Sequence, residues 1–226
     1  MARKRGSKRR RMNQDERKEE EEEEQTTGGG VDEGSEKSVE KSEKCPVVVF
    51  AHGAGAPSSS DFMVRWKGML AKALNAVEMV TFDYPYIAGG KRRAPPKAEK
   101  LVDFHRDVVQ KTLAKYPGHP LILAGKSMGS RVSCMVAGEK DITVSAVVCL
   151  GYPLKGSKDG LCPLAKLEAV RKKMNSINAL HVIEGGDHSF KIGKKHLQSS
   201  GNNQEEAEDI AVQAIAKFVS NIMKER

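Results

Sequence analysis

The chain has 226 residues and a formal net charge of +8, from 38 Lys and Arg against 30 Asp and Glu. It holds no run of 18 apolar residues and no apolar segment near its start, which argues against a transmembrane helix and a secretory signal. The unbroken acidic run at residues 19–24 argues against a transit peptide. These features favour a protein of the cell interior with one apolar core.

Residues 1–44 form a charged tail, with 12 basic and 13 acidic side chains and almost no large apolar one. Such a segment cannot bury enough apolar surface to offset its ordering entropy, so we expect it to be disordered. The basic cluster from Arg3 to Arg11 is typical of a nuclear localisation signal or of a solvated tail. The sequence therefore predicts a nuclear or cytoplasmic protein whose single domain spans residues 45–226.

The four cysteines, at positions 45, 134, 149 and 162, form no C-x-x-C pair and no cluster with zinc spacing. We interpret them as small, reduced, apolar residues of a reducing compartment. No metal and no cofactor are expected from this pattern.

Short β-branched runs alternate with segments of helical periodicity from residue 47 to the end. In chain order we expect a strand at 47–51, a helix at 61–75, a strand at 77–82, a loop at 88–96, a helix at 96–116, a strand at 121–124, a helix around 131–137, a strand at 143–150, a helix at 163–174, a strand at 180–183 and a helix at 205–223. This alternation predicts an α/β fold with a mostly parallel sheet between two helical layers.

A G-x-S-x-G motif follows the strand at 121–124, with Ser127 at its centre. Its two glycines allow the sharp strand-to-helix turn that lifts a nucleophilic serine above a sheet. The same residues resemble the end of a P-loop. That alternative fails because Pro120 stands where the P-loop needs a glycine, and because an apolar strand replaces the phosphate-binding loop.

The small-residue turn after the strand at 47–51 begins with His52 and includes Ala54 and Gly55. Such a turn can aim backbone amides at an oxyanion, and Met128, directly after the serine, would supply another amide. We expect His52 to fix this loop rather than to react. A dinucleotide fingerprint is incomplete here, since its third glycine would fall at Ser58.

His188 follows the predicted strand at 180–183 and a pair of glycines, where a general base would lie at the carboxyl edge of a parallel sheet. A triad in the order serine, acid, histidine needs a carboxylate between residues 127 and 188. Asp159 stands in a loop and is the best candidate, whereas Asp187 is adjacent to the histidine and would seldom face it. Asp159 would then fix the imidazole tautomer.

A resemblance to the KANL3/Tex30 α/β-hydrolase-like family is carried by five runs: VFAHGAGAPSSS (49–60), TFDYPY (81–86), GHPLILAGKSMGSRVSCM (118–135), CLGYPLKG (149–156) and EGGDHSF (184–190). The resemblance covers residues 45–226. The chain looks like a plant member of this family, and the family relates more loosely to dienelactone hydrolases. The resemblance implies an α/β-hydrolase fold, a three-layer sandwich, with a Ser127, Asp159, His188 triad. Some relatives are subunits of a nuclear histone acetyltransferase complex.

The sequence departs from that family between Leu150 and Asp159. Family members carry a further apolar strand just before the acid, whereas here Lys158 stands only eight residues after Leu150. A parallel strand needs a crossover of about a dozen residues or more. We therefore expect one strand of the usual sheet to be missing, as an internal deletion would produce, and Asp159 to extend from the loop after the strand at 143–150.

Three functions are compatible with these residues. The first is a serine hydrolase that cleaves an ester or thioester of a small molecule through an acyl-enzyme. The second is a non-catalytic scaffold or subunit of a nuclear chromatin-associated complex. The third is nucleic-acid binding through the basic clusters at 91–93 and 191–195, which we do not expect, because aromatic residues make up only 5% of the chain. No membrane partner is expected.

Overall fold

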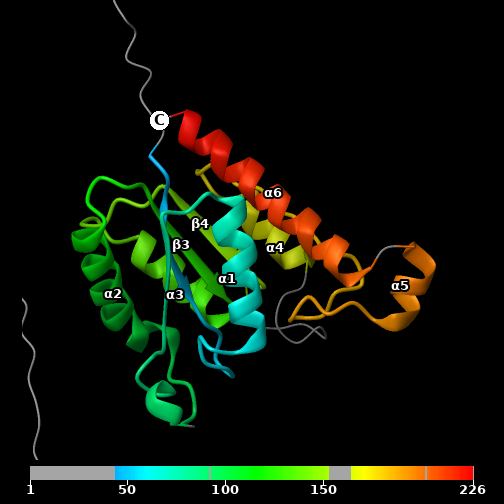
Figure 1. Ribbon diagram of the computed structural model, residues 1–226, viewed down its shortest axis with the longest axis horizontal. Helices are drawn as coiled ribbons and strands as arrows, with labels where there is room; N and C mark the ends of the chain where they lie inside the picture. Colours follow the sequence, from blue (N-terminus) through cyan, green and yellow to red (C-terminus); the bar gives the residue numbers. More distant parts are fainter. Residues whose placement is uncertain (1–43, 92, 153–163, 202, 226) are drawn as a thin grey trace, which may run out of the picture. The chain divides into compact units, whose positions relative to one another are not determined.

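The computed structural model describes residues 44–91, 93–152, 164–201 and 203–225 (Figure 1). The tail predicted at residues 1–44, with its basic cluster, lies outside these residues except for Lys44. The described strands form one parallel sheet in the order β2-β1-β3-β4. The strands are β1 (Val47–Ala51), β2 (Glu78–Phe82), β3 (Leu121–Lys126) and β4 (Ala146–Leu150).

Helical segments separate β1, β2, β3 and β4, as the alternating pattern predicts, and further helices follow β4. The helices are α1 (Asp61–Ala73), the 3-10 turns η1 (Ala88–Gly90) and η2 (Ala98–Leu101), α2 (Val102–Lys115), α3 (Met128–Ala137), α4 (Leu164–Arg171), α5 (Lys194–Ser200) and α6 (Gln204–Lys224). The predicted α/β class is therefore confirmed, and most bounds agree with prediction to within a few residues. The short helix α5 was not predicted, because Leu197 is its only large apolar residue and one apolar position shows no helical periodicity.

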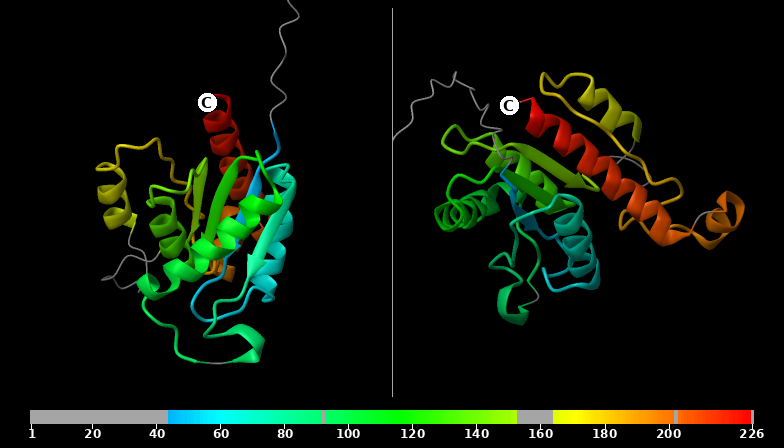
Figure 2. Two further views of the ribbon diagram at one scale, coloured as in Figure 1. Left: turned by 90° about the vertical axis from the view of Figure 1, so that its left-hand side faces the viewer. Right: turned by 45° about the horizontal axis from the view of Figure 1, so that its top comes forward.

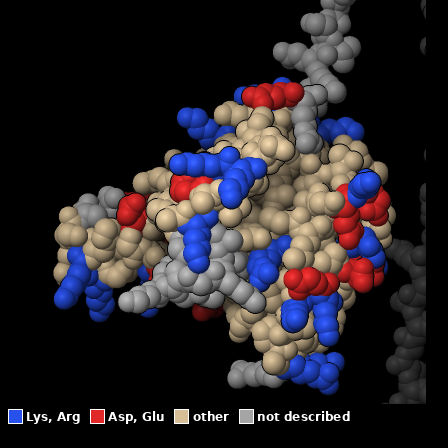
Figure 3. Space-filling view, turned by 180° about the vertical axis from the view of Figure 1, so that it is seen from behind, with Lys and Arg blue, Asp and Glu red and all other residues tan. Residues whose placement is uncertain are grey.

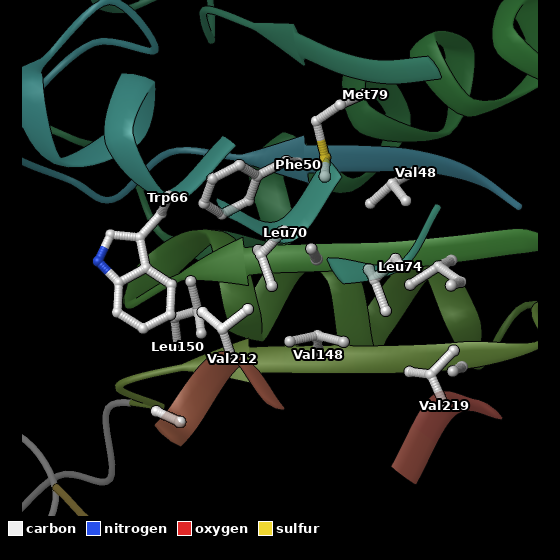
Figure 4. Packing of buried hydrophobic residues seen from close by; sticks show 14 of the residues in the cluster. Val48, Phe50, Trp66, Leu70, Leu74, Met79, Val148, Leu150, Val212 and Val219 are labelled. Atoms are coloured by element: carbon white, nitrogen blue, oxygen red, sulfur yellow. The ribbon is translucent and has the colours of Figure 1, made fainter. Parts of the chain in front are cut away.

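The sheet is buried on both faces because successive side chains of its strands point in opposite directions. In β1, Val48 and Phe50 pack with α1 and α6, whereas Val47 and Val49 pack with α2 and α3. Figure 2 shows these helices on the two sides of the sheet. Figure 4 shows the first of the two cores, where the Trp66 ring lies beside Phe50. This explains why the strands read as continuous apolar runs.

The strand predicted at residues 180–183 is wrong, because the structure assigns no strand there and no partner in the sheet. The segment is partly exposed, with the Val182 side chain at 40%. A β-strand is stabilised by packing against its neighbours rather than by its own sequence. The described part of the sheet ends at β4, and this apolar segment does not join it.

None of the described helices is long and apolar enough to cross a membrane.

Candidate active site

Ser127 occupies the turn between β3 and α3 with backbone angles φ 52° and ψ −113°. A positive φ is uncommon outside glycine and costs on the order of 1–3 kcal/mol. The amide of Ser127 donates a hydrogen bond of 2.8 Å to the Leu150 carbonyl of β4, which holds the turn in place. The serine therefore lies at the carboxyl edge of the sheet, between a strand and a helix, as the motif predicts.

Both glycines of the motif are required by the close packing of this turn. A Cβ atom on Gly129 would lie 2.5 Å from the carbonyl oxygen of Ala51 and 2.6 Å from that of His52. A Cβ atom on Gly125 would collide with the backbone of Gly129 and Ser130. Helix α3 thus approaches the end of β1 more closely than a side chain would permit, and this approach fixes the position of the serine.

His188 lies beside the serine, with 2.8 Å between its Nε2 atom and Ser127 Oγ. The histidine belongs to a loop that is closed by an antiparallel bridge between Gly186 and Ile192. When the imidazole is neutral with its proton on Nδ1, the serine hydroxyl can donate to Nε2. This is the geometry in which a histidine withdraws the proton of an attacking serine.

Asp187 stabilises the loop that carries His188. Its Oδ1 atom accepts hydrogen bonds from the amides of Ser189 (2.7 Å) and Lys191 (3.0 Å). Its own amide donates to the Lys191 carbonyl at 3.0 Å. The carboxylate therefore caps a tight turn whose apex presents His188.

Lys126 joins the serine turn to the histidine loop. Its ammonium donates a hydrogen bond to the backbone oxygen of His188, and it lies 5.2 Å from the ring centroid of Phe62 and 4.9 Å from that of Phe190. Burial lowers the pKa of this ammonium to about 8, against the opposing influence of the Asp187 carboxylate. Because Lys126 is the last residue of β3, it does not lie in a phosphate-binding loop.

The start of α6 holds the far side of the histidine loop. The Gln204 side chain donates a hydrogen bond to the Phe190 carbonyl and accepts one from the Ile192 amide, both at 2.8 Å. It also donates to Glu208 (2.7 Å), which is buried and paired with Arg65 of α1 at 2.6 Å. This network connects α1, α6 and the loop that carries the histidine.

His52 has a structural role, as expected. Its Nε2 atom accepts a hydrogen bond of 3.0 Å from the Tyr84 amide, so its proton is on Nδ1, which lies 2.6 Å from the Gly53 carbonyl. Burial lowers the pKa of His52, in keeping with this neutral state. The Tyr86 hydroxyl donates to the Ala54 carbonyl at 3.0 Å. Together these bonds fix the turn at residues 53–55.

A cavity of about 300 Å³ opens beside the serine and the histidine. Its lining combines the turn after β1, the first residues of α1, the end of β3 and the loop that carries the histidine: Gly53, Ala54, Gly55, Ala56, Ser60, Phe62, Met63, Lys126, Ser127, His188 and Ser189. Ala54 and Gly55 thus lie at the cavity where the oxyanion is expected, and Met128 begins α3 directly after the serine. Their role as amide donors stays a prediction. Within residues 44–91, 93–152, 164–201 and 203–225, no three His, Cys, Asp or Glu side chains gather as metal ligands would.

Asp159, the predicted acid of the triad, lies outside the described residues. The sequence did not predict the roles of Lys126 and Gln204. Lys126 contacts a loop more than 60 positions away in the chain. Gln204 contacts that loop only because α6 begins at this residue. The capping box of Asn203 and Glu206, in which Asn203 Oδ1 accepts from the Glu206 amide at 2.8 Å, is the signal that could have placed that helix start.

Comparisons with known proteins identify the family and the fold. The family described as "Alpha/beta hydrolase domain" matches residues 44–156, half of the chain. An alpha-beta serine hydrolase homologue from Coxiella burnetii is similar in structure, with a TM-score of 0.56 and 17% identity over 79% of this chain and 86% of that one. A Trichoderma reesei cutinase matches at a TM-score of 0.40 and 16% identity over 80% of this chain and 77% of its own. The chain belongs to the alpha/beta hydrolase domain family.

Proposed function

We propose that the protein is a serine hydrolase that cleaves an ester or thioester of a small molecule. The observation that carries the proposal is the 2.8 Å contact between His188 Nε2 and Ser127 Oγ, on a serine held at positive φ beside a cavity of about 300 Å³. Strained backbone of this kind is costly and persists where the surrounding structure imposes it. Family membership supports the fold, and the pairing of the two side chains supports the chemistry.

The reaction follows from the positions of the two side chains. Ser127 Oγ attacks the acyl carbonyl carbon while His188 Nε2 takes the hydroxyl proton, which gives a tetrahedral oxyanion. The amides of Ala54 and Met128 are the proposed donors to that oxyanion. The imidazolium returns its proton to the departing alcohol or thiol, and the acyl-enzyme remains. Water, deprotonated by His188, then attacks the acyl carbon and releases the acid and the free serine.

The cavity favours a short acyl or alcohol group. About 300 Å³ is at the small end of ligand pockets. Phe62 and Met63 give one wall an apolar surface, whereas the turn at residues 53–55 leaves room close to the serine. We therefore expect short-chain esters to be cleaved faster than long-chain ones.

Hydrolysis of p-nitrophenyl esters of increasing acyl length tests this function. We expect turnover of the acetate or butyrate, a burst of p-nitrophenol under single-turnover conditions, and a decrease of kcat by 10³-fold or more in Ser127→Ala. Ser199→Ala is the matched control, because that serine lies in α5, where its hydroxyl donates to the His196 carbonyl. Turnover that persists in Ser127→Ala would refute the proposal.

Asp159 is proposed as the acid that orients the His188 imidazole. Asp159→Asn should lower kcat by at least 10²-fold, because the amide would favour the wrong imidazole tautomer. Asp141→Asn, on an exposed residue before β4, is the matched control and should keep full activity. Equal activity of the two variants would exclude Asp159 from the triad.

The finer resemblance to the KANL3/Tex30 proteins leaves a non-catalytic nuclear scaffold as the alternative. That function predicts no ester turnover and a set of co-purified nuclear proteins that Ser127→Ala does not change. Nucleic acid is not among the proposed partners, because aromatic residues make up only 5% of the chain. On the face shown in Figure 3, Lys and Arg are interspersed with Asp and Glu.

A further inference from the structure

Two cysteines that the proposed reaction does not use lie side by side at the surface. Cys134 is on α3 and Cys149 is on β4, and both are free and exposed. Their Sγ atoms are 3.6 Å apart. Cys45, by contrast, lies before β1 and accepts a hydrogen bond from the Asn75 side chain. The pair joins elements that are 15 residues apart in the chain, and spacing alone did not reveal it.

The thiols also affect each other's ionisation. The hydrogen bond between them lowers the pKa of Cys134 and raises that of Cys149. The thiolate is the form of cysteine that attacks a disulfide. A thiolate on Cys134 would have the second thiol directly beside it, which is the arrangement of an attacking and a resolving cysteine.

Cys134 lies in a helix and Cys149 in a strand, and their sulfur atoms need to move only a short distance to form a disulfide. A disulfide bond is about 2.05 Å long, so the atoms must approach by roughly 1.5 Å. Cys134 follows Ser127 on α3 by about two helical turns. Cys149 directly precedes Leu150, whose carbonyl accepts the hydrogen bond from the Ser127 amide.

We propose that Cys134 and Cys149 are an oxidation site and form a reversible disulfide that links α3 to β4, by exchange with a small-molecule disulfide such as oxidised glutathione. The Cys134 thiolate attacks one sulfur of the small disulfide and releases one thiolate, which takes up the proton that Cys134 lost. The deprotonated Cys149 then attacks the Cys134 sulfur and releases the second small thiol. Two protein thiols are oxidised, and one small disulfide is reduced to two thiols.

Once formed, the disulfide should also stabilise the folded protein. It closes a loop of about 15 residues between two elements that are already packed together, and a loop of that size restricts the unfolded chain. For a domain of this length, we expect Tm to rise by roughly 6–12 °C on oxidation. This inference is independent of the proposed hydrolase activity, because its readouts are mass and melting temperature.

Peptide mapping of the full chain tests the site. The protein is incubated with oxidised glutathione, alkylated and digested with trypsin, which cuts after Lys140 and so separates the two cysteines into peptides 132–140 and 141–155. We expect these two peptides to be joined, and dithiothreitol to release them. The cross-link and the rise in Tm should be absent from Cys134→Ser and Cys149→Ser and present in Cys45→Ser.

Three outcomes would overturn the proposal. Both cysteines could remain open to alkylation, they could stop as mixed disulfides with glutathione, or they could pair with Cys45 or Cys162 instead. Each gives a distinct peptide mass. The single variants replace exposed side chains, so each is expected to fold, and its melting curve in dithiothreitol should match that of the reduced wild type.

Discussion

Replacing Ser127 with glycine should stabilise the protein while abolishing its reactivity. The serine has φ 52° and ψ −113°, which costs a residue with a Cβ atom on the order of 1–3 kcal/mol. Glycine adopts this conformation freely but loses about 0.5–1 kcal/mol of additional chain entropy on folding. The net gain should be roughly 1–2 kcal/mol, which raises Tm by about 2–8 °C in a domain of this length.

Ser127→Ala is the reference for this measurement. It removes the same hydroxyl and the same contact with His188, but it keeps the Cβ atom and therefore the strain. Thermal unfolding and urea titration of the two variants isolate the backbone contribution. If the glycine variant unfolds at or below the temperature of the alanine variant, the turn is not strained and the reasoning fails. A gain would show that stability is given up here to hold the hydroxyl beside His188.

Two further substitutions test Lys126, beside the site, and His105, a buried histidine of α2. Lys126→Met should keep the packing between the phenyl rings but lose the hydrogen bond to the His188 carbonyl, so kcat for ester hydrolysis should fall by roughly tenfold. Lys72→Met, on an exposed residue, is the control. An unchanged kcat in Lys126→Met would contradict the role of Lys126 in positioning His188. Burial lowers the pKa of His105 to about 4, so between about pH 6.5 and pH 4 the unfolded chain binds a proton that the folded chain excludes. The free energy of unfolding should fall by roughly 3 kcal/mol over this range, and urea titrations of His105→Gln should show a shallower fall; parallel curves would contradict the assignment.

Local chemistry explains why the first four strands and the serine turn were predictable. Fully buried parallel strands read as apolar runs, and glycine at 125 and 129 fits the close approach of α3 to the ends of β3 and β1. His188 was found because the carboxyl edge of a parallel sheet gathers reactive groups from distant segments. These inferences use short windows of sequence and one rule of topology.

The misses concern contacts between distant segments. The run at 180–183 has strand composition, but it pairs with no strand among the described residues, and composition does not reveal whether a pairing partner is present. Lys126 belongs to the motif, yet its hydrogen bond depends on a loop 62 residues later. The pairing of Cys134 with Cys149 depends on the register of α3 against β4. Each of these needs the fold before it can be seen.

Labelling with a fluorophosphonate tests the central claim most directly, because the probe reacts with a serine only when its hydroxyl is activated. Intact-mass analysis of the folded protein should show one adduct, and peptide mapping should place it on Ser127. The adduct should be absent from Ser127→Ala and from protein unfolded in urea, and His188→Asn should label far more slowly. A folded protein that stays unlabelled, or one that is labelled equally in Ser127→Ala, would contradict the account.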